Sequence, residues 1–352
     1  MLETAYLITQ QRNEEALGEL RTPTYPAGTR PEERRHHDWM VRERRKMGMA
    51  GHVRHIFRTG KAYATLNLTD DGRPLTYRLA KESAQAKLWE TEEAIEIRKL
   101  MTTDTIKPQL IKNIPADRVR DITYYNPQVS EKIMDGKIKR RVRGTIGGDR
   151  VNYPGEVSAR TAEMEVVKLL LNSVLNTAGA KWMTADITDY YLNTPLERKE
   201  YLRIQRKFLP EEVIKEFGFD KYMVNGSVLF EVNKGMYGLP QAGLLAQKRL
   251  IAHLATAGYH QCKYVPCLFE HVSSGTQFTL VVDDFGIKYC TDEGAQHLLD
   301  TLAALYLITT DWTGGKYLGL TIRFGDDTRG KYVSLSIPGY VAKQLLRFFV
   351  VV

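Results

Sequence analysis

Apolar and polar residues alternate in a regular way only from about Leu79 onward. Apolar positions at helical spacing predict helices over Ala80–Met101, Thr161–Leu175, Ala242–Ala255 and Ala295–Leu305. Strand-like runs cover Lys181–Ile187, Ser227–Val232, Phe278–Tyr289, Lys316–Arg323 and Lys331–Ile337. These strands and helices mix without strict alternation, which predicts an α+β fold whose sheet has helices packed on one face.

The first 78 residues do not follow this pattern. Thr22–Gly28 has the composition of a linker, and the stretch after it is rich in arginine, so we expect a basic, partly irregular extension over residues 1–78. Four histidines lie between residues 36 and 55, but no cysteine is near them and basic neighbours repel a cation. We therefore expect no zinc site there. The total length of 352 residues indicates two or three subdomains.

We expect neither a membrane-spanning segment nor an export signal. No run of eighteen or more apolar residues occurs, and the first thirty residues carry early acids and no apolar block. Cys262, Cys267 and Cys290 match neither a zinc site nor a disulfide framework. We expect an intracellular protein whose cysteines are small core residues, and no membrane partner.

The net charge of +8, with a pI near 9.2, suggests a polyanionic partner. The charge lies in blocks, because residues 30–61 hold ten Lys/Arg against four acids and residues 132–150 hold seven against two. Such blocks suit contact with a phosphate backbone. A solvated basic face has the same composition, so charge alone leaves both interpretations open.

The dipeptide Asp-Asp occurs three times. Asp70-Asp71 and Asp326-Asp327 lie next to glycine and arginine, and we expect both in solvent-exposed turns. Asp283-Asp284 differs, because an apolar run precedes it and another follows it. This context predicts two carboxylates at the tip of a buried hairpin, where they repel each other and lose hydration unless a cation compensates.

Asp186 supplies a third carboxylate at the end of the strand predicted over Lys181–Ile187. A carboxylate at a strand end beside a hairpin-tip pair is what a two-metal site for phosphoryl transfer requires. We expect two Mg²⁺ ions, because Mg²⁺ takes hard oxygen ligands from one or two carboxylates and from substrate phosphates. Mn²⁺ is an alternative metal, and a plain β-turn at Asp283-Asp284 is the alternative without a metal.

Five segments follow one another in order: Asp186–Leu196, Lys234–Gly243, Val281–Asp284, Tyr317–Leu320 and Gly339–Phe348. They resemble, in the same order, the first carboxylate motif, the Tyr-Gly-Leu…Gln motif, the aromatic-x-Asp-Asp box and two later segments of copia-type LTR retrotransposon reverse transcriptases. These enzymes are the reverse transcriptase domain of retrovirus-related Pol polyproteins. The resemblance covers about residues 79–349, and five motifs in order are a strong signal although each alone is weak.

This resemblance implies a right-hand polymerase with fingers at about residues 79–180 and 197–238 and a palm at about residues 181–196 and 239–337. The antiparallel palm sheet would be backed by helices, and residues 338–352 would begin a truncated thumb or connection. Asp186, Asp283 and Asp284 would be the catalytic residues. They would also hold the metal ions, with Ile187 as a further ligand.

The resemblance also implies nucleotide-binding residues. Tyr191 aligns with the aromatic residue that crowds the sugar 2′ position, Gln241 with a glutamine near the incoming nucleotide, and Arg141 and Arg143 with a fingers segment that contacts the triphosphate. A core aromatic residue and a surface-loop glutamine are the alternatives for Tyr191 and Gln241. We expect a separate set of basic residues, Lys139, Arg203 and Arg206, to contact the template and primer.

The function that follows from the resemblance is RNA-directed DNA synthesis from deoxynucleoside triphosphates onto a primer 3′-hydroxyl. The implied partners are an RNA or DNA template with its primer, and the rest of a Pol polyprotein, including integrase and RNase H. The implied location is the cytoplasm, with the nucleus or a virus-like particle as alternatives. A decayed or domesticated homologue that only binds nucleic acid is the second hypothesis. A template-directed RNA polymerase is a third, which Tyr191 and Gln241 argue against.

Overall fold

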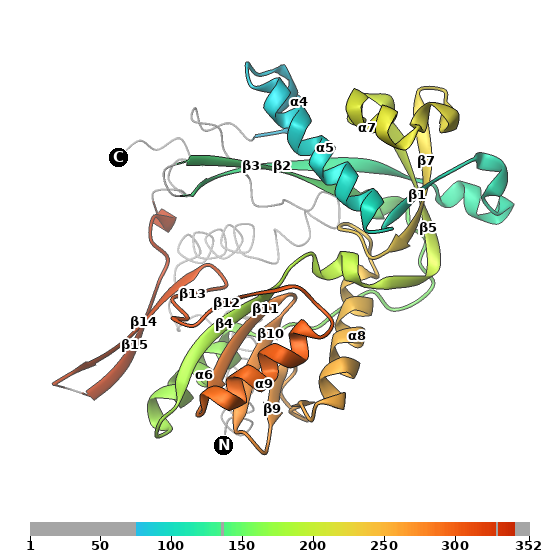
Figure 1. Cartoon of the computed structure of the whole chain (residues 1–352). Helices are drawn as coiled ribbons and strands as arrows, with labels where there is room; N and C mark the ends of the chain where they lie inside the picture. The colour runs from blue at the N-terminus through green and yellow to red at the C-terminus, as the bar shows by residue number, and fades with distance from the viewer. Residues whose placement is uncertain (1–74, 135–136, 329, 342–352) are drawn as a thin grey trace, which may run out of the picture.

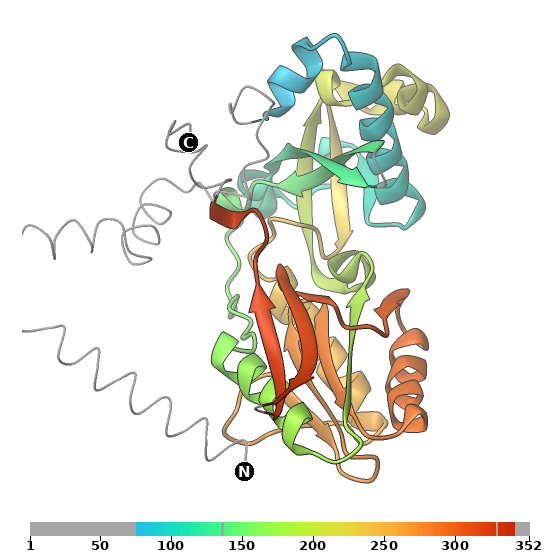
Figure 2. The same cartoon turned by 90° about the vertical axis from the view of Figure 1, so that its left-hand side faces the viewer.

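The computed structural model describes residues 75–134, 137–328 and 330–341 (Figure 1). Most of the expected N-terminal extension, with its histidines and Asp70-Asp71, lies outside the described residues, as does the expected thumb beyond residue 341. The described part is a mixed α+β fold with three sheets, and the first and second sheets lie one above the other (Figure 2). The predicted fold class is therefore confirmed at this level.

The second sheet is antiparallel throughout, with the strand order β12-β4-β11-β10-β9-β8. Its strands are β4 (Lys181–Ile187), β8 (His260–Gln261), β9 (Leu268–His271), β10 (Thr276–Val281), β11 (Asp284–Tyr289) and β12 (Ile308–Asp311). The strand predicted over Lys181–Ile187 has the bounds of β4, and the run Phe278–Tyr289 is the hairpin of β10 and β11.

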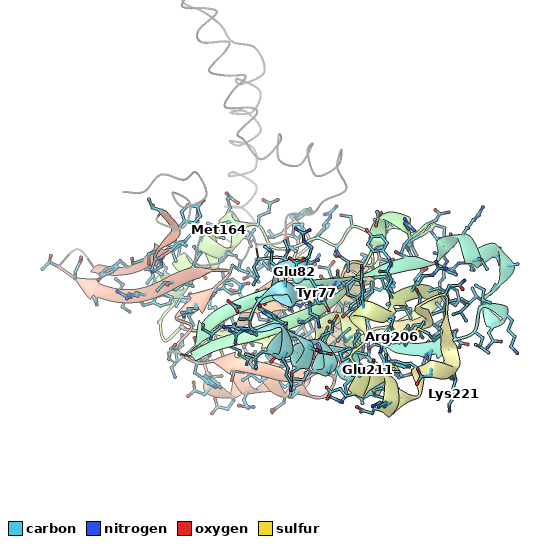
Figure 3. The ribbon with its side chains drawn as sticks, turned by 90° about the horizontal axis from the view of Figure 1, so that it is seen from above. Tyr77, Glu82, Met164, Arg206, Glu211 and Lys221 are labelled. Carbon is cyan, nitrogen blue, oxygen red and sulfur yellow. The ribbon has the colours of Figure 1, made fainter. Side chains whose placement is uncertain are left out.

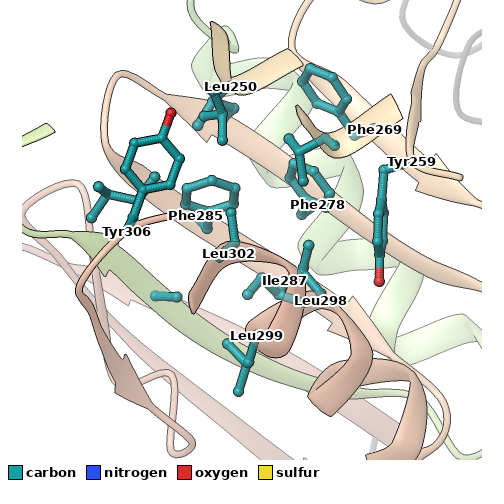
Figure 4. Close-up of a cluster of buried hydrophobic side chains, with 14 of the residues drawn as sticks. Leu250, Tyr259, Phe269, Phe278, Phe285, Ile287, Leu298, Leu299, Leu302 and Tyr306 are labelled. Atoms are coloured by element: carbon teal, nitrogen blue, oxygen red, sulfur yellow. The ribbon is translucent and has the colours of Figure 1, made fainter. Parts of the chain in front are cut away.

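One face of the second sheet packs on α8 (Ala242–Thr256) and α9 (Asp292–Ala303). Alternate residues such as Phe285 and Ile287 of β11 point to these helices and meet Leu250 of α8 and Leu298 of α9 in one apolar core (Figure 4). These four side chains are fully buried, which is the main stabilising contribution at this face.

The opposite face of the second sheet is covered by α6 (Met164–Asn176), because Leu170 and Leu171 of this helix share a core with Trp182 of β4. The expectation that all helices pack on one face is therefore wrong. It failed because the sequence shows that a helix is amphipathic but not which face of a sheet it covers.

The first sheet has the order β1-β7-β5-β2-β3, with β6 paired to β7. Its strands are β1 (Ile106–Gln109), β2 (Thr123–Met134), β3 (Lys137–Ile146), β5 (Pro195–Gln205), β6 (Met223–Val224) and β7 (Ser227–Lys234). Helix α5 (Ala86–Thr102) buries Ala94, Ile97 and Leu100 against this sheet, and α7 (Glu211–Phe217) joins the same core. Of these strands only β7 was predicted. The many charged residues of β3 and β5 obscure the alternation of apolar and polar positions that marks a strand.

The third sheet is a small antiparallel unit of β13 (Lys316–Tyr317), β14 (Leu320–Asp327) and β15 (Gly330–Ser336). The strand predicted over Lys316–Arg323 is interrupted at Leu318 and Gly319, which both have positive φ and form the turn between β13 and β14. Asp326 and Asp327 are exposed, as predicted, but they are the last residues of β14 and pair with β15, so the expected turn at these residues is wrong.

The helix predicted over Ala80–Met101 is divided into α4 (Tyr77–Glu82) and α5. The hydroxyl of Ser83 donates to the carbonyl of Ala80 at 2.7 Å and accepts from the Gln85 N–H at 3.2 Å. A serine hydroxyl that bonds nearby backbone groups competes with the helical hydrogen bonds, which explains the break. Of the cysteines, Cys262 and Cys267 are buried as predicted, whereas Cys290 is half-buried.

Candidate active site

Asp283 and Asp284 lie at the turn between β10 and β11. Val281 pairs with Asp284, so the turn itself consists of Val282 and Asp283. Val282 has a φ of 61°, a left-handed conformation that a β-branched residue rarely adopts. Backbone strain of this kind is common at functional sites, where the surrounding structure holds it in place.

Asp186 joins this turn through the register of the second sheet. Strand β4 runs antiparallel to β11, and Asp186 lies directly opposite Asp284. The Ile187 N–H donates to the carbonyl of Asp283 at 3.0 Å, which extends the pairing past the end of the ladder. Three carboxylates from distant parts of the sequence therefore meet at one end of the sheet.

These carboxylates remain accessible. Ala185 and Ile187 of β4 and Phe285 of β11 point into the core under α8 and α9, so Asp186 and Asp284 between them point to the opposite face. Each of the three aspartates is half-buried. The group can therefore receive a ligand while its strands are fixed by the core.

Burial raises the pKa of all three carboxyl groups. It is the largest cause for Asp186, and the nearby Arg141 and Arg143 partly offset the rise. Burial also raises the pKa of Asp283, and the charge of Asp186 adds to the rise. A hydrogen bond from the N–H of Asp283 itself and the charge of Arg143 lower this pKa. Burial and the charges of Asp283 and Asp186 raise the pKa of Asp284 to about 6. Carboxylates that repel one another in this way attract a cation, because the cation removes the repulsion.

The donor set suits Mg²⁺. Asp186, Asp283 and Asp284 offer hard carboxylate oxygens, and Ile187, whose side chain is apolar and buried, offers only its main-chain carbonyl. Within the described residues, no three acidic, histidine or cysteine side chains form a ready-made metal cage. Mg²⁺ does not require one, since it keeps several waters and binds through one or two carboxylates plus substrate phosphates.

Arg141 and Arg143 face the carboxylates from β3. Their neighbour Val142 is buried toward α4 and α5, so the two arginines lie on the other face of the strand. The guanidinium of Arg143 lies over the ring of Tyr237, 4.2 Å from its centre. Both arginines act on the pKa of Asp186, so the sheet that carries them and the aspartates share one electrostatic environment.

Tyr191 lies in the turn after β4 and is half-buried. Its ring meets the ring of Tyr237 edge to face at 5.2 Å between centres, and burial together with Asp283 raises the pKa of its hydroxyl. A side chain at Gly243, in the first turn of α8, would lie 3.7 Å from this hydroxyl. Tyr191 is thus beside the aspartates, but it also packs against both large cores, so both sequence interpretations remain open.

Gln241 is fully buried before the first turn of α8, so the surface-loop interpretation is wrong. Its side-chain amide donates to Glu200 Oε1 at 3.0 Å, and its own Oε1 has no hydrogen-bond partner. Glu200 is also fully buried and binds Arg118 at 2.7 Å and Arg198 at 3.1 Å. Asp121 completes this network by accepting from both arginines.

Sequence reasoning missed this network. Glu200 lies where the pairing of β5 with β7 shifts register, and such an irregularity leaves no mark on the alternation of polar and apolar residues. Asp189, which contacts Lys99 and Arg141, was also missed as a separate site residue. A second aspartate three residues after Asp186 was the available signal.

The three residues expected to bind nucleic acid occupy two different places. Lys139 and Arg203 are exposed, and alternation along β3 and β5 puts them on the face of the first sheet that α5 does not cover. Arg206 follows β5 and forms an ion pair with Glu211 at the start of α7 (Figure 3). It also donates to the Leu209 carbonyl at 2.9 Å. The guanidinium of Arg206 is therefore already neutralised in part within the protein.

Comparisons with known proteins add one structural likeness. No family model matches the chain, and no curated protein matches it. Among solved structures, the foamy viral protease-reverse transcriptase dRH in complex with ds DNA is similar with a TM-score of 0.35 and 13% sequence identity. The match covers 68% of this chain and 35% of that chain, so this chain spans about a third of that protein's length. Similarity at this level does not by itself assign an activity.

None of the helices in the described part of the chain is long and apolar enough to cross a membrane.

Proposed function

We propose that this chain is an RNA-directed DNA polymerase of the copia retrotransposon type. The observation that carries the proposal is the meeting of Asp186, Asp283 and Asp284 at one end of an antiparallel sheet, opposite Arg141 and Arg143. Carboxylates that bind divalent cations, placed opposite arginines that bind phosphates, suit the transfer of a nucleotide from a triphosphate. On this proposal the second sheet is the palm, and the first sheet with α4, α5 and α7 forms the fingers.

Each residue then has a separate task. Asp186, Asp283, Asp284 and the Ile187 carbonyl would hold the Mg²⁺ ions, which supply charge neutralisation at the attacking and leaving oxygens. Arg141 and Arg143 neutralise the triphosphate, since a guanidinium offers paired donors to phosphate oxygens. Tyr191 limits the space beside the sugar.

Gln241 contributes through the first turn of α8. Its side chain is fully buried and bonded to Glu200, so Gln241 would support the nucleotide site by holding the start of α8 in place. Its amide is already held by Glu200, so the orientation of the side chain is fixed before a nucleotide arrives.

The proposed partners are an RNA or DNA template with its primer, deoxynucleoside triphosphates and the rest of a Pol polyprotein. The proposed location is the cytoplasm, with the nucleus or a virus-like particle as alternatives. Lys139 and Arg203 would contact the phosphate backbone of the template and primer, and Arg206 would add less because Glu211 neutralises it.

Primer extension on an RNA template, with Mg²⁺ or Mn²⁺, tests the proposal. Asp186→Asn removes a metal-binding charge at constant volume and should reduce extension by about a hundredfold or more. Asp326→Asn is the matched control, because Asp326 is exposed on β14 away from the proposed site, and it should extend normally. Extension by Asp186→Asn at the parent rate would refute the metal assignment. No extension by the parent, with retained nucleic-acid binding, would favour the homologue that only binds.

A further inference from the structure

Asp189 lies between the two sheets, three residues after Asp186. Its backbone is left-handed, with a φ of 52°, and its carbonyl accepts from the Asn193 side chain at 3.1 Å. Its carboxylate accepts from Lys99 Nζ at 3.0 Å and lies 3.8 Å from Arg141 Nη2. One acid of the second-sheet side therefore contacts two cations of the first-sheet side.

Lys99 is fixed more firmly than Arg141. Its ammonium group also pairs with Glu96 Oε2 at 2.9 Å, and the Glu96 side chain is only 5% exposed. Glu96 Oε1 in turn accepts from the Gly144 N–H of β3 at 2.9 Å. These bonds connect α5, β3 and Asp189, and they hold Lys99 beside the Asp189 carboxylate.

Arg141 is held more loosely. Its side chain is 49% exposed, and its distance of 3.8 Å from Asp189 is longer than a direct hydrogen bond. Ion pairs this exposed contribute little to stability. Arg141 can therefore exchange its partner at low cost, whereas Arg143 is held over the Tyr237 ring.

We infer that Asp189 is a positioning residue that holds Arg141 toward the aspartates when no nucleotide is bound and gives it up to the incoming triphosphate. The inference rests on the proposed function. A triphosphate carries more negative charge than one carboxylate and offers oxygens to both arms of the guanidinium, so it competes successfully for Arg141. Lys99 stays with Asp189 after the exchange and keeps its charge compensated.

The exchange has a measurable consequence, because the triphosphate must displace a carboxylate before it contacts Arg141. Asp189→Asn removes the competing charge, keeps the volume and leaves an oxygen that can accept from Lys99. Triphosphate binding should therefore become tighter by about two- to fivefold, the range of an exposed ion pair. A purely structural role for Asp189 predicts the opposite, since loss of a contact would loosen the site.

Calorimetric titration of the parent and its variants with inorganic tripolyphosphate, and with a deoxynucleoside triphosphate, tests this inference without relying on activity. Asp149→Asn is the matched control: it removes one acid from the first-sheet side, where Asp149 bonds Tyr124 rather than Arg141. A double-mutant cycle with Arg141→Ala shows whether the effect acts through Arg141. In primer extension, Asp189→Asn should lower the KM for nucleotide without raising kcat.

Three results would overturn the inference. They are weaker or unchanged binding in Asp189→Asn, the same gain in Asp149→Asn, and a gain that persists after Arg141→Ala. If the parent extends primers and binds triphosphate but Asp189→Asn binds no tighter, only this inference fails. A parent that binds no triphosphate at all removes the proposed function and the inference together.

Discussion

The surroundings of Tyr191 bear on whether it is a core residue or a residue of the proposed site. Its ring touches Tyr190 and Tyr237 and packs against both large cores, yet the side chain is half-buried and close enough to Asp283 for that charge to raise its pKa. A residue that served only as core would not need to face the carboxylates. A residue that limits the space beside the sugar has to face them.

We predict that Tyr191→Ala admits ribonucleotides that the parent rejects, because the truncation opens space beside the sugar. It should also destabilise the fold by about 2 kcal/mol or more, since a packed aromatic ring is lost. The ratio of ribonucleotide to deoxynucleotide incorporation measures the first effect. Tyr191→Phe keeps the ring and should retain the parent ratio. An unchanged ratio in Tyr191→Ala would leave Tyr191 as a core aromatic residue.

Glu93 is a buried acid with no part in the proposed chemistry. It is 1% exposed, one of its oxygens has no partner, and the other accepts from the Tyr77 hydroxyl. Burial raises its pKa from 4.5 to about 8, although Tyr77 and Lys81 oppose the rise. The folded protein therefore prefers Glu93 protonated, whereas the unfolded chain ionises it near its ordinary pKa.

This difference predicts that stability falls as the pH rises. The stabilisation from protonated Glu93 is present in full below pH 4.5, where both states are protonated, and is lost progressively up to about pH 8. The expected slope is at most about 1.4 kcal/mol per pH unit. Glu93→Gln should remove this slope in denaturant titrations across the range. Glu82→Gln, at a side chain that is 62% exposed, should keep it. A slope that survives in Glu93→Gln would assign it to other groups.

At the scale of elements, β3 and β5 carry basic residues on the face of the first sheet that α5 does not cover, but only those of β3 act on the pKa of the aspartates. Arg143 of β3 affects the pKa of Asp186 and Asp283. Arg203 lies on β5, between β7 and β2, with its charge exposed. One face can therefore serve nucleotide binding at one place and nucleic-acid binding at another.

We predict separable phenotypes for these two arginines. Arg143→Ala should raise the KM for nucleotide and hardly change template affinity. Arg203→Ala should weaken template binding regardless of sequence and reduce the slope of log affinity against log salt by about one unit. Arg206→Ala should have a smaller effect, because Glu211 already pairs with it. Filter-binding titrations at several salt concentrations check this, and identical phenotypes for Arg143 and Arg203 would contradict it.

At the scale of the molecule, α8 belongs to both large cores. Ala242 in its first turn packs with the first sheet, and Leu250 further along packs with the second. Gln241 before this helix binds Glu200 of β5, and Arg198 of the same network donates to the Asn152 carbonyl at 2.8 Å. A buried polar network therefore ties β5 of the first sheet to the start of α8, the helix that packs in both cores.

We predict that Glu200→Gln destabilises the described fold by about 1.5–3 kcal/mol, because it removes one of the two buried carboxylates that Arg118 and Arg198 share and leaves Asp121 to compensate both arginines. Both sheets should lose stability together, because the network holds the start of α8 and this helix packs in both cores. Denaturant unfolding followed by fluorescence and circular dichroism measures this. Glu197→Gln, at an exposed position of the same strand, should cost little. A parent-like midpoint for Glu200→Gln would show that the charges are not needed for the junction.

The sequence by itself determined the elements with strong periodicity and the local setting of Asp283-Asp284. Strand β4, helix α8 and the β10–β11 hairpin were predicted within a few residues, because their apolar residues alternate with the period of a strand or a helix. The apolar flanks of Asp283-Asp284 distinguished this pair from the exposed Asp326-Asp327. These features are local, and local patterns are visible in one sequence.

Only the tertiary structure decided which distant residues meet. The register of β4 against β11 puts Asp186 opposite Asp284, and a shift of one residue would have turned Asp186 into the core. Lys99, Asp189 and Glu200 form ion pairs with residues that are far away in the chain. Burial turned Gln241 from an expected surface residue into a buried one. Long-range pairing and burial depend on how whole elements pack, and no single stretch of sequence contains that information.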